Sequence, residues 1–157
     1  MIFSRFDSPL GEILLTGDGL ALTGLYTRDH PRRPAVVGEP DDVAFAEVRR
    51  QLTEYFAGSR LTFDLPLAAR GTDFQHRVWA ELQRIGYGDT ASYRKVATRL
   101  GDSKAVRAVG VANGRNPISI VVPCHRVVGH DGSLTGYAGG LTAKKWLLDH
   151  EAAHRAG

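Results

Sequence analysis

Strand-like and helix-like patterns are segregated along this chain of 157 residues, and their order is what most constrains its fold. Short apolar runs separated by turn sequences occupy residues 2–6, 12–16 and 20–26. Runs of this kind predict three strands. The strong patterns that follow have mainly helical spacing. Strands followed by helices indicate an α+β fold, with a small antiparallel sheet near the N-terminus.

The first part of the chain also contains one helix-like pattern. Residues 27–42 are rich in proline and are predicted to form an exposed loop. Asp41 or Asp42 is expected to cap a helix that Gly58 ends. A further strand is predicted over 61–65. The apolar face of the helix comprises Phe45, Val48, Leu52, Tyr55 and Phe56.

A change of pattern near residue 70 divides the chain into two lobes. We predict that residues 1–70 form an N-terminal scaffold lobe of β/α type. Residues 71–157 are predicted to form a mainly helical C-terminal lobe that carries the functional residues. Thr72 is expected to cap its first helix, and its last helix is expected over 142–151.

Two short helices joined by a tight turn are predicted in the middle of the C-terminal lobe. Ser92 is expected to cap the first, which Gly101 ends, and Asp102 or Ser103 is expected to open the second. Residues 92–115 contain six Lys or Arg side chains and one acid. A basic helix-turn-helix is typical of nucleic-acid binding, although such charges also suit a merely solvated face.

Cys124 is the single cysteine of the chain, and it follows an apolar run over 118–122 that predicts a buried strand. One cysteine excludes an internal disulfide and a Cys-x-x-Cys metal or redox motif. We therefore expect a reducing, cytoplasmic location, and no secretory signal or membrane span is apparent. A lone cysteine is most often an inert core residue, so its neighbours decide whether it reacts.

The residues after Cys124 supply what a reactive thiol needs. A thiolate forms beside a base or a positive charge, and His125 and Arg126 provide both. Adjacent side chains on an extended chain point to opposite faces, so either Pro123 breaks the strand or a water relays the proton. A histidine base also needs an acid to orient it. The candidates are Asp131, Asp149 and Glu151.

Five glycines in the twelve positions from Gly129 to Gly140 predict a loop whose backbone approaches another group closely. A Cys–His–acid set beside a basic helix pair points to chemistry on nucleic acid. A cysteine hydrolase would use the same three side chains, but it has no need of the helix pair.

Short motifs of the C-terminal lobe recur together in one known family. The matching blocks are 71–75, 87–88, 92–93, 105–110, 116–117, 123–127 (Pro-Cys-His-Arg-Val), 139–140 and 146–148. With these blocks, residues 71–151 resemble the O6-alkylguanine-DNA alkyltransferase family, also called the methylated-DNA–protein-cysteine methyltransferases. The N-terminal lobe is similar to that family only loosely.

The resemblance implies an irreversible DNA repair reaction. Cys124 would attack the alkyl carbon on O6 of a damaged guanine in duplex DNA and keep the alkyl group on sulfur. Each molecule would then act once. Whether O4-alkylthymine is also a substrate stays open.

The resemblance also implies roles around the cysteine. His125 would act as a base through a water molecule, and Glu151 would orient it. Asn116 would connect the helix-turn-helix to the segment that carries Cys124. Tyr93 would stand at the mouth of the pocket, where it can donate a proton to the departing guanine.

For DNA binding, the resemblance implies that the second helix enters the minor groove. Arg107 would replace a guanine that is flipped out of the duplex, because a stacked base cannot present its O6 substituent to a thiolate. Further contacts to DNA are expected from Arg94, Ser103, Lys104 and Arg115.

The pocket for the flipped base would be formed by Tyr137 and the glycine loop. The other residues expected to line it are Val127, Ala138, Gly139 and Lys144. Ala138 stands where several family members have serine, so a hydroxyl contact to guanine is lost and tolerance of bulky alkyl groups is expected to change.

The expected partner is double-stranded DNA carrying O6-alkylguanine, bound by a monomer with or without cooperativity along the duplex. No cofactor is expected. No metal is expected either, because the N-terminal lobe lacks the cysteines with which some members bind zinc. The alternative function is a non-enzymatic protein that binds alkyl damage. Proteins of that kind lack the cysteine of this motif, which disfavours the alternative.

Overall fold

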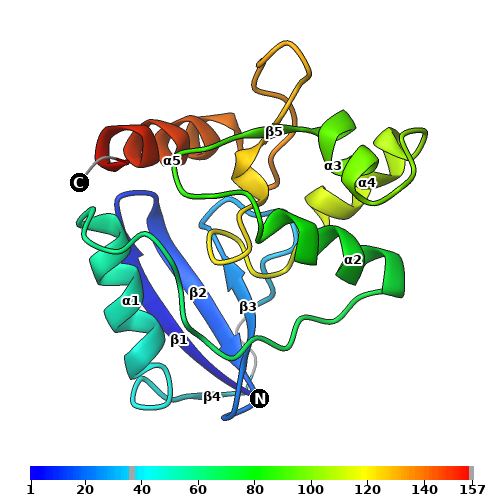
Figure 1. Cartoon of the computed structure of the whole chain (residues 1–157). Coiled ribbons are helices and arrows are strands. Elements are labelled where there is room, and N and C mark those ends of the chain that lie inside the picture. Colours follow the sequence, from blue (N-terminus) through cyan, green and yellow to red (C-terminus); the bar gives the residue numbers. More distant parts are fainter. Residues whose placement is uncertain (36–37, 156–157) are drawn as a thin grey trace.

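The computed structural model describes residues 1–35 and 38–155, and it has the predicted α+β fold (Figure 1). The strands are β1 (Ile2–Ser8), β2 (Gly11–Gly17), β3 (Leu22–Tyr26), β4 (Glu39–Pro40), β5 (Ala91–Ser92) and β6 (Val127–Val128). The helices are α1 (Ala46–Phe56), α2 (Asp73–Leu82), α3 (Tyr93–Arg99), α4 (Val106–Gly114) and α5 (Leu141–His154), with a 3₁₀ turn, η1, over Cys124–Arg126.

The N-terminal sheet has the strand order β3-β2-β1-β4. The three strands expected near the N-terminus are confirmed, and β1 and β2 form an antiparallel hairpin in which Ser8 pairs with Gly11. The backbone of Gly11 has φ 92°, a conformation that glycine adopts without strain. The sheet is mixed rather than purely antiparallel, because β4 lies parallel to β1 within the stretch predicted to be loop.

Two further expectations for the N-terminal lobe are wrong. Neither Asp41 nor Asp42 caps α1, whose N-cap is Phe45. The Asp42 carboxylate instead accepts a hydrogen bond from the Ser4 hydroxyl at 2.6 Å, and the Asp41 carboxylate accepts one from the Ala44 amide at 3.0 Å. Residues 61–65 form no strand because their hydrogen bonds go elsewhere: the Asp64 amide donates to the side chain of Gln51 on α1.

Local capping chemistry sets the beginnings of α2 and α3. The Thr72 hydroxyl accepts from the Gln75 amide and the Gln75 side chain accepts from the Thr72 amide, so the expected cap is a complete capping box. Ser92 caps α3 as expected, accepting from the Lys95 amide. Neither Asp102 nor Ser103 caps α4, because the Asp102 carboxylate is engaged by the Lys104 amide inside the connecting turn.

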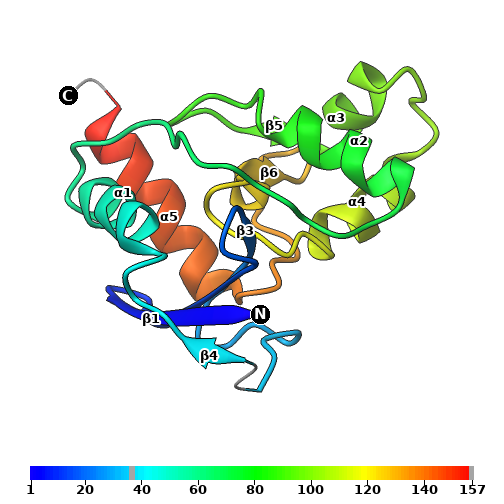
Figure 2. The same cartoon turned by 90° about the horizontal axis from the view of Figure 1, so that it is seen from below.

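The two lobes share one hydrophobic core. Buried side chains from the sheet and α1 form a single cluster with those of α2, α3, α4 and α5. In both views α2, α3 and α4 lie together at the end of the molecule away from α1, while α5 lies close to α1 (Figures 1 and 2). The contact between α1 and α5 includes a 2.8 Å hydrogen bond between the His150 ring and the Tyr55 carbonyl. Among the described residues, no helix is both long and apolar enough to cross a membrane.

Candidate active site

The segment that leads to the cysteine is a series of tight turns, so the strand predicted over 118–122 is wrong. The Asn116 side chain holds these turns: its Nδ2 donates to the Val122 carbonyl at 2.8 Å, and its Oδ1 accepts from the Ile118 amide at 3.0 Å. Ile120 has φ 72°, which is strained for a β-branched residue. The segment pairs with the sheet through an isolated bridge between Ile118 and Leu25, and its apolar side chains pack in the same core as those of the strands.

Cys124 begins the η1 turn and is 3% exposed. Burial raises the pKa of its thiol to about 11, although a hydrogen bond from Asn116 and the charge of Lys144 act in the opposite direction. The resting cysteine is therefore a protonated thiol at neutral pH, and any reaction as a nucleophile requires a group that takes its proton.

His125 is fully buried beside the cysteine, and Glu151 fixes its tautomer. Its Nε2 lies 2.8 Å from the Glu151 Oε2. A carboxylate only accepts hydrogen bonds, so Nε2 carries the proton and Nδ1 is left as an acceptor. Nδ1 is buried and has no hydrogen-bond partner among the described residues. Burial lowers the pKa of His125, so the ring is neutral at pH 7 and able to accept a proton at Nδ1.

Glu151 is the centre of a buried hydrogen-bond network. Its oxygens accept from Arg126 at 2.8 and 3.0 Å and from the Tyr55 hydroxyl at 2.6 Å. Burial by itself would raise the pKa of Glu151, but its contacts with His125 and Arg126 outweigh burial and lower that pKa. Glu151 is therefore a carboxylate at neutral pH.

The structure separates the three candidate acids. Asp149 is exposed and pairs with Lys145 one helical turn away, and Asp131 accepts a hydrogen bond from the Ser133 amide within its own loop. Only Glu151 of these three contacts His125.

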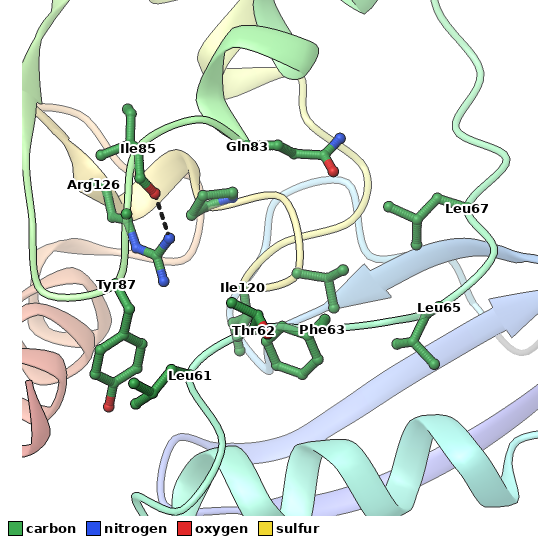
Figure 3. Close-up of a pocket in the computed structure, with 13 residues that line it drawn as sticks. Leu61, Thr62, Phe63, Leu65, Leu67, Gln83, Ile85, Tyr87, Ile120 and Arg126 are labelled. Carbon is green, nitrogen blue, oxygen red and sulfur yellow. Dashed lines mark hydrogen bonds between the residues drawn. The ribbon is translucent and has the colours of Figure 1, made fainter. Parts of the chain in front are cut away.

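Arg126 was expected to supply positive charge beside the thiol, but its guanidinium is bound by other groups. Its guanidinium donates to Glu151 and to the Ile85 carbonyl at 2.7 Å (Figure 3). It stacks over the Tyr87 ring at 5.8 Å. Arg126 also lines a cavity of about 170 Å³ between the lobes, whose opposite wall includes Leu61, Phe63, Leu65 and Leu67 (Figure 3).

Side chains from two helices hold the glycine loop near the cysteine. The Tyr93 hydroxyl on α3 donates to the Thr135 carbonyl at 3.1 Å. The Lys144 ammonium on α5 donates to the same carbonyl at 2.8 Å and to the Val127 carbonyl at 2.5 Å. Burial lowers the pKa of Lys144 to about 8, while the nearby Cys124 acts to raise it.

Tyr137 lies within the same loop, next to the cysteine. Its hydroxyl is buried without a hydrogen-bond partner among the described residues, and burial together with the proximity of Cys124 raises its pKa well above the usual value. Ala138 is half-buried. A Cβ on Gly139 would lie 2.6 Å from the Thr27 hydroxyl and 2.8 Å from the Tyr137 ring, so only glycine fits there.

The basic residues singled out for DNA binding are all exposed. Within residues 1–35 and 38–155, their side chains form no ion pair, so their charges are available to an outside partner. Arg107 lies in the first turn of α4, whereas Arg115 follows its last residue, about 12 Å away along the axis. Arg115 lines a cleft with Arg32 and Arg70 of the N-terminal lobe. Of the other residues expected to contact DNA, Arg94 lies on α3, and Ser103 and Lys104 lie in the connecting turn.

Sequence reasoning missed Tyr55 as a member of the site. Its helical spacing with Leu52 and Phe56 marks it only as a core residue. A tyrosine that is completely buried usually has a hydrogen-bond partner, but the sequence does not reveal that the partner is Glu151, 96 positions away. Among the described residues, no cluster of three or more His, Cys, Asp or Glu could hold a metal ion.

The fold and this site define a class: α+β proteins with a buried Cys–His–Glu arrangement next to an exposed basic helix pair. Models of known protein families show which family within that class the chain matches. Residues 1–69 match the ribonuclease-like domain of 6-O-methylguanine DNA methyltransferase, and residues 73–153 match its DNA binding domain. The chain therefore belongs to the 6-O-methylguanine DNA methyltransferase family.

Individual relatives agree along almost the whole chain. A methylated-DNA–protein-cysteine methyltransferase of Mycobacterium tuberculosis is 48% identical over 150 residues, which are 95% of this chain and 91% of the relative. One from Methanosarcina acetivorans is 46% identical and covers 98% of this chain and 99% of the relative. The crystal structure of Mycobacterium tuberculosis OGT in complex with DNA superposes with a TM-score of 0.93 at 47% identity, over 98% of this chain and 94% of that one.

Proposed function

We propose that this chain repairs duplex DNA by moving the alkyl group of O6-alkylguanine onto the sulfur of Cys124. In this step a bond forms between Sγ and the alkyl carbon, and the bond between that carbon and O6 breaks. The electron pair of the broken bond stays on the guanine, which then takes up one proton. A thioether does not release its alkyl group under mild conditions, so each molecule reacts once.

The observation that carries the proposal is the tautomer of His125: Glu151 binds Nε2–H, so Nδ1 is an acceptor, and no described residue donates to it. His125 is neutral, its Nε2–H is held by Glu151, and Nδ1 is the nitrogen left to remove the thiol proton, directly or through one water. The resulting imidazolium is stabilised by the Glu151 carboxylate. A base is required here because the pKa of the buried thiol is high, and the thiolate forms only when a proton acceptor is in place.

Tyr93 supplies a proton donor near the departing base. Its hydroxyl donates to the Thr135 carbonyl and more weakly to the Gly136 carbonyl. We infer that a flipped base entering below the glycine loop takes over this hydrogen bond. The Lys144 contacts to the Val127 and Thr135 carbonyls hold the loop in place while Tyr93 changes partner.

The exposed basic face of α3 and α4 is the surface we assign to the duplex. Arg107 projects from the first turn of α4 and is the residue we assign to the space left by the flipped base. Flipping is needed because Cys124 is buried and cannot reach a base that remains stacked. The surrounding cations bind phosphates, which predicts an affinity that falls as salt rises.

The test is to incubate the protein with a duplex that contains one O6-methylguanine and to examine the peptide that carries Cys124 by mass spectrometry. One methyl group on Cys124 and an equal amount of restored guanine are expected. Cys124→Ser should transfer nothing and still bind the duplex. An unmodified Cys124 after tight binding to the damaged duplex would support the damage-binding alternative. Duplexes with O4-methylthymine tested in parallel show whether that base is also a substrate.

A further inference from the structure

Tyr55 brings the N-terminal lobe into contact with the candidate active site. It lies in the last turn of α1 and is fully buried. Its hydroxyl donates to Glu151 Oε2 at 2.6 Å, and the same oxygen accepts from His125 Nε2 at 2.8 Å. One carboxylate oxygen therefore joins α1 of the N-terminal lobe to the histidine beside Cys124.

The Tyr55 ring is held from several sides, so its hydroxyl has a fixed position. Ring centroids lie 5.4 Å from Phe63, 6.1 Å from Tyr87 and 5.4 Å from His150. The His150 ring also forms a hydrogen bond with the Tyr55 carbonyl. A donor fixed in this way restricts the orientation of the Glu151 carboxylate, and the carboxylate in turn orients the histidine.

We propose that Tyr55 is a positioning residue of this site: its hydroxyl holds Glu151 in the orientation that keeps His125 Nε2 protonated and Nδ1 free. This inference rests on the proposed function for its catalytic consequence. It gives the N-terminal lobe a part in the chemistry, because α1 then supplies a donor to the network as well as core side chains. Tyr55 itself stays protonated, because burial and the charge of Glu151 raise its pKa well above the usual value.

The direction of the effect on His125 follows from electrostatics. The hydrogen bond from Tyr55 partly neutralises the carboxylate, so a charged His125 ring receives less stabilisation from it, while the neutral ring keeps its Nε2–H bond to Glu151. Without the hydroxyl, Glu151 becomes a stronger acceptor and stabilises the charged form of His125. The pKa of His125 should then rise. Besides Tyr55, the titratable or charged groups near the His125–Glu151 pair are Tyr87, Cys124, Arg126, Tyr137 and Lys144.

Tyr55→Phe removes the hydroxyl and keeps the ring, and Tyr87→Phe is its matched control. The Tyr87 hydroxyl is buried in the same region but has no hydrogen-bond partner among the described residues. The ring nitrogens of His125 are titrated by ¹⁵N NMR in the free protein, and methyl transfer from an O6-methylguanine duplex is timed across pH. For Tyr55→Phe we expect the pKa of His125 to rise by roughly 0.5–1 unit and transfer to slow about tenfold at neutral pH. Tyr87→Phe should match the wild type in both.

A His125 pKa and a transfer profile that are the same in the Tyr55→Phe, Tyr87→Phe and wild-type proteins would overturn the inference. If Tyr55→Phe does not fold, 3-fluorotyrosine placed at position 55 keeps the hydroxyl and makes it a stronger donor. It should move the pKa of His125 downward, and an unchanged pKa would again overturn the inference. The NMR titration needs no DNA, so it is distinct from the test of the proposed function: loss of methyl transfer in the wild type would refute only the latter.

Discussion

The two lobes hold their polar groups together by different means. In the N-terminal lobe, backbone hydrogen bonds between antiparallel strands join β1, β2 and β3, with one register shift at Thr16–Gly17. Near Cys124, by contrast, backbone carbonyls and amides are bound by side chains, chiefly those of Asn116, Lys144 and Tyr93. A ladder gives a rigid platform, whereas side-chain donors place single atoms of an irregular segment. The second arrangement is the one that a reacting group needs.

Side chains of both lobes bind the carboxylate of Glu151. Donors reach this carboxylate from α1 through Tyr55 and from η1 through His125 and Arg126. The arrangement around Cys124 depends on it.

The largest expected effect comes from Glu151→Gln, compared with Asp149→Asn on the same helix. The first change removes the charge that pairs with the buried Arg126, and we expect a loss of about 3–5 kcal/mol in the free energy of unfolding. Methyl transfer should fall by roughly 10²–10³, because His125 loses the acceptor that fixes its tautomer. Asp149 is exposed and pairs only with Lys145, so its variant should change neither quantity. Urea denaturation and single-turnover kinetics measure both.

These two lobes also differ in how far their structure could be predicted. Thr72 and Ser92 were identifiable as caps because the capping residue, the helix start and the hydrogen bond all fall within four residues. The run over 118–122 looks like a strand because its side chains are apolar and β-branched. It folds into turns for two reasons. Asn116, only two to six residues away, binds its backbone groups, and its side chains are buried in a core formed with distant parts of the chain, which the local pattern does not reveal.

The candidate site, too, could be predicted only in part from the sequence. The motif around Cys124 and its resemblance to a family supplied the cysteine, the histidine and the choice of Glu151. The resemblance covers residues 71–151, and Tyr55 lies outside it, in a lobe read as scaffold. Its contact with Glu151 depends on how α1 docks against α5, which the residue pattern does not encode.

A second prediction compares two amide side chains, one from each lobe, that form hydrogen bonds with backbone groups. Asn116 binds the turns before Cys124, and Gln51 on α1 binds both the amide and the carbonyl of Asp64. Asn116→Ala and Gln51→Ala should each cost about 1–3 kcal/mol of stability, because each removes hydrogen bonds to backbone groups, buried ones at Asn116 and partly buried ones at Gln51.

Only the first variant should also slow methyl transfer, by roughly tenfold or more, since Asn116 also lowers the pKa of the Cys124 thiol. Equal transfer rates in the two variants, measured at saturating DNA, would contradict the contrast between the lobes.

A smaller effect is expected from removing single surface charges. Arg107→Ala should weaken binding to an O6-methylguanine duplex by about tenfold and leave stability unchanged. Arg50→Ala is the matched change in the N-terminal lobe, where Arg50 pairs with Glu54 on the solvent-facing side of α1, and it should leave DNA affinity as it is. Fluorescence anisotropy at several salt concentrations measures both. A similar loss in the two variants would mean that binding depends only on overall charge.

The pH dependence of methyl transfer tests most directly the claim that His125 and Glu151 remove the proton from Cys124. Burial lowers the pKa of His125 below its usual value, and the neutral ring is the active form. The rate should therefore rise with pH through that lowered pKa and then stay level above neutrality. A rate that instead rises tenfold per pH unit toward the thiol pKa of about 11 would show that a free thiolate reacts without the histidine, and would contradict the account.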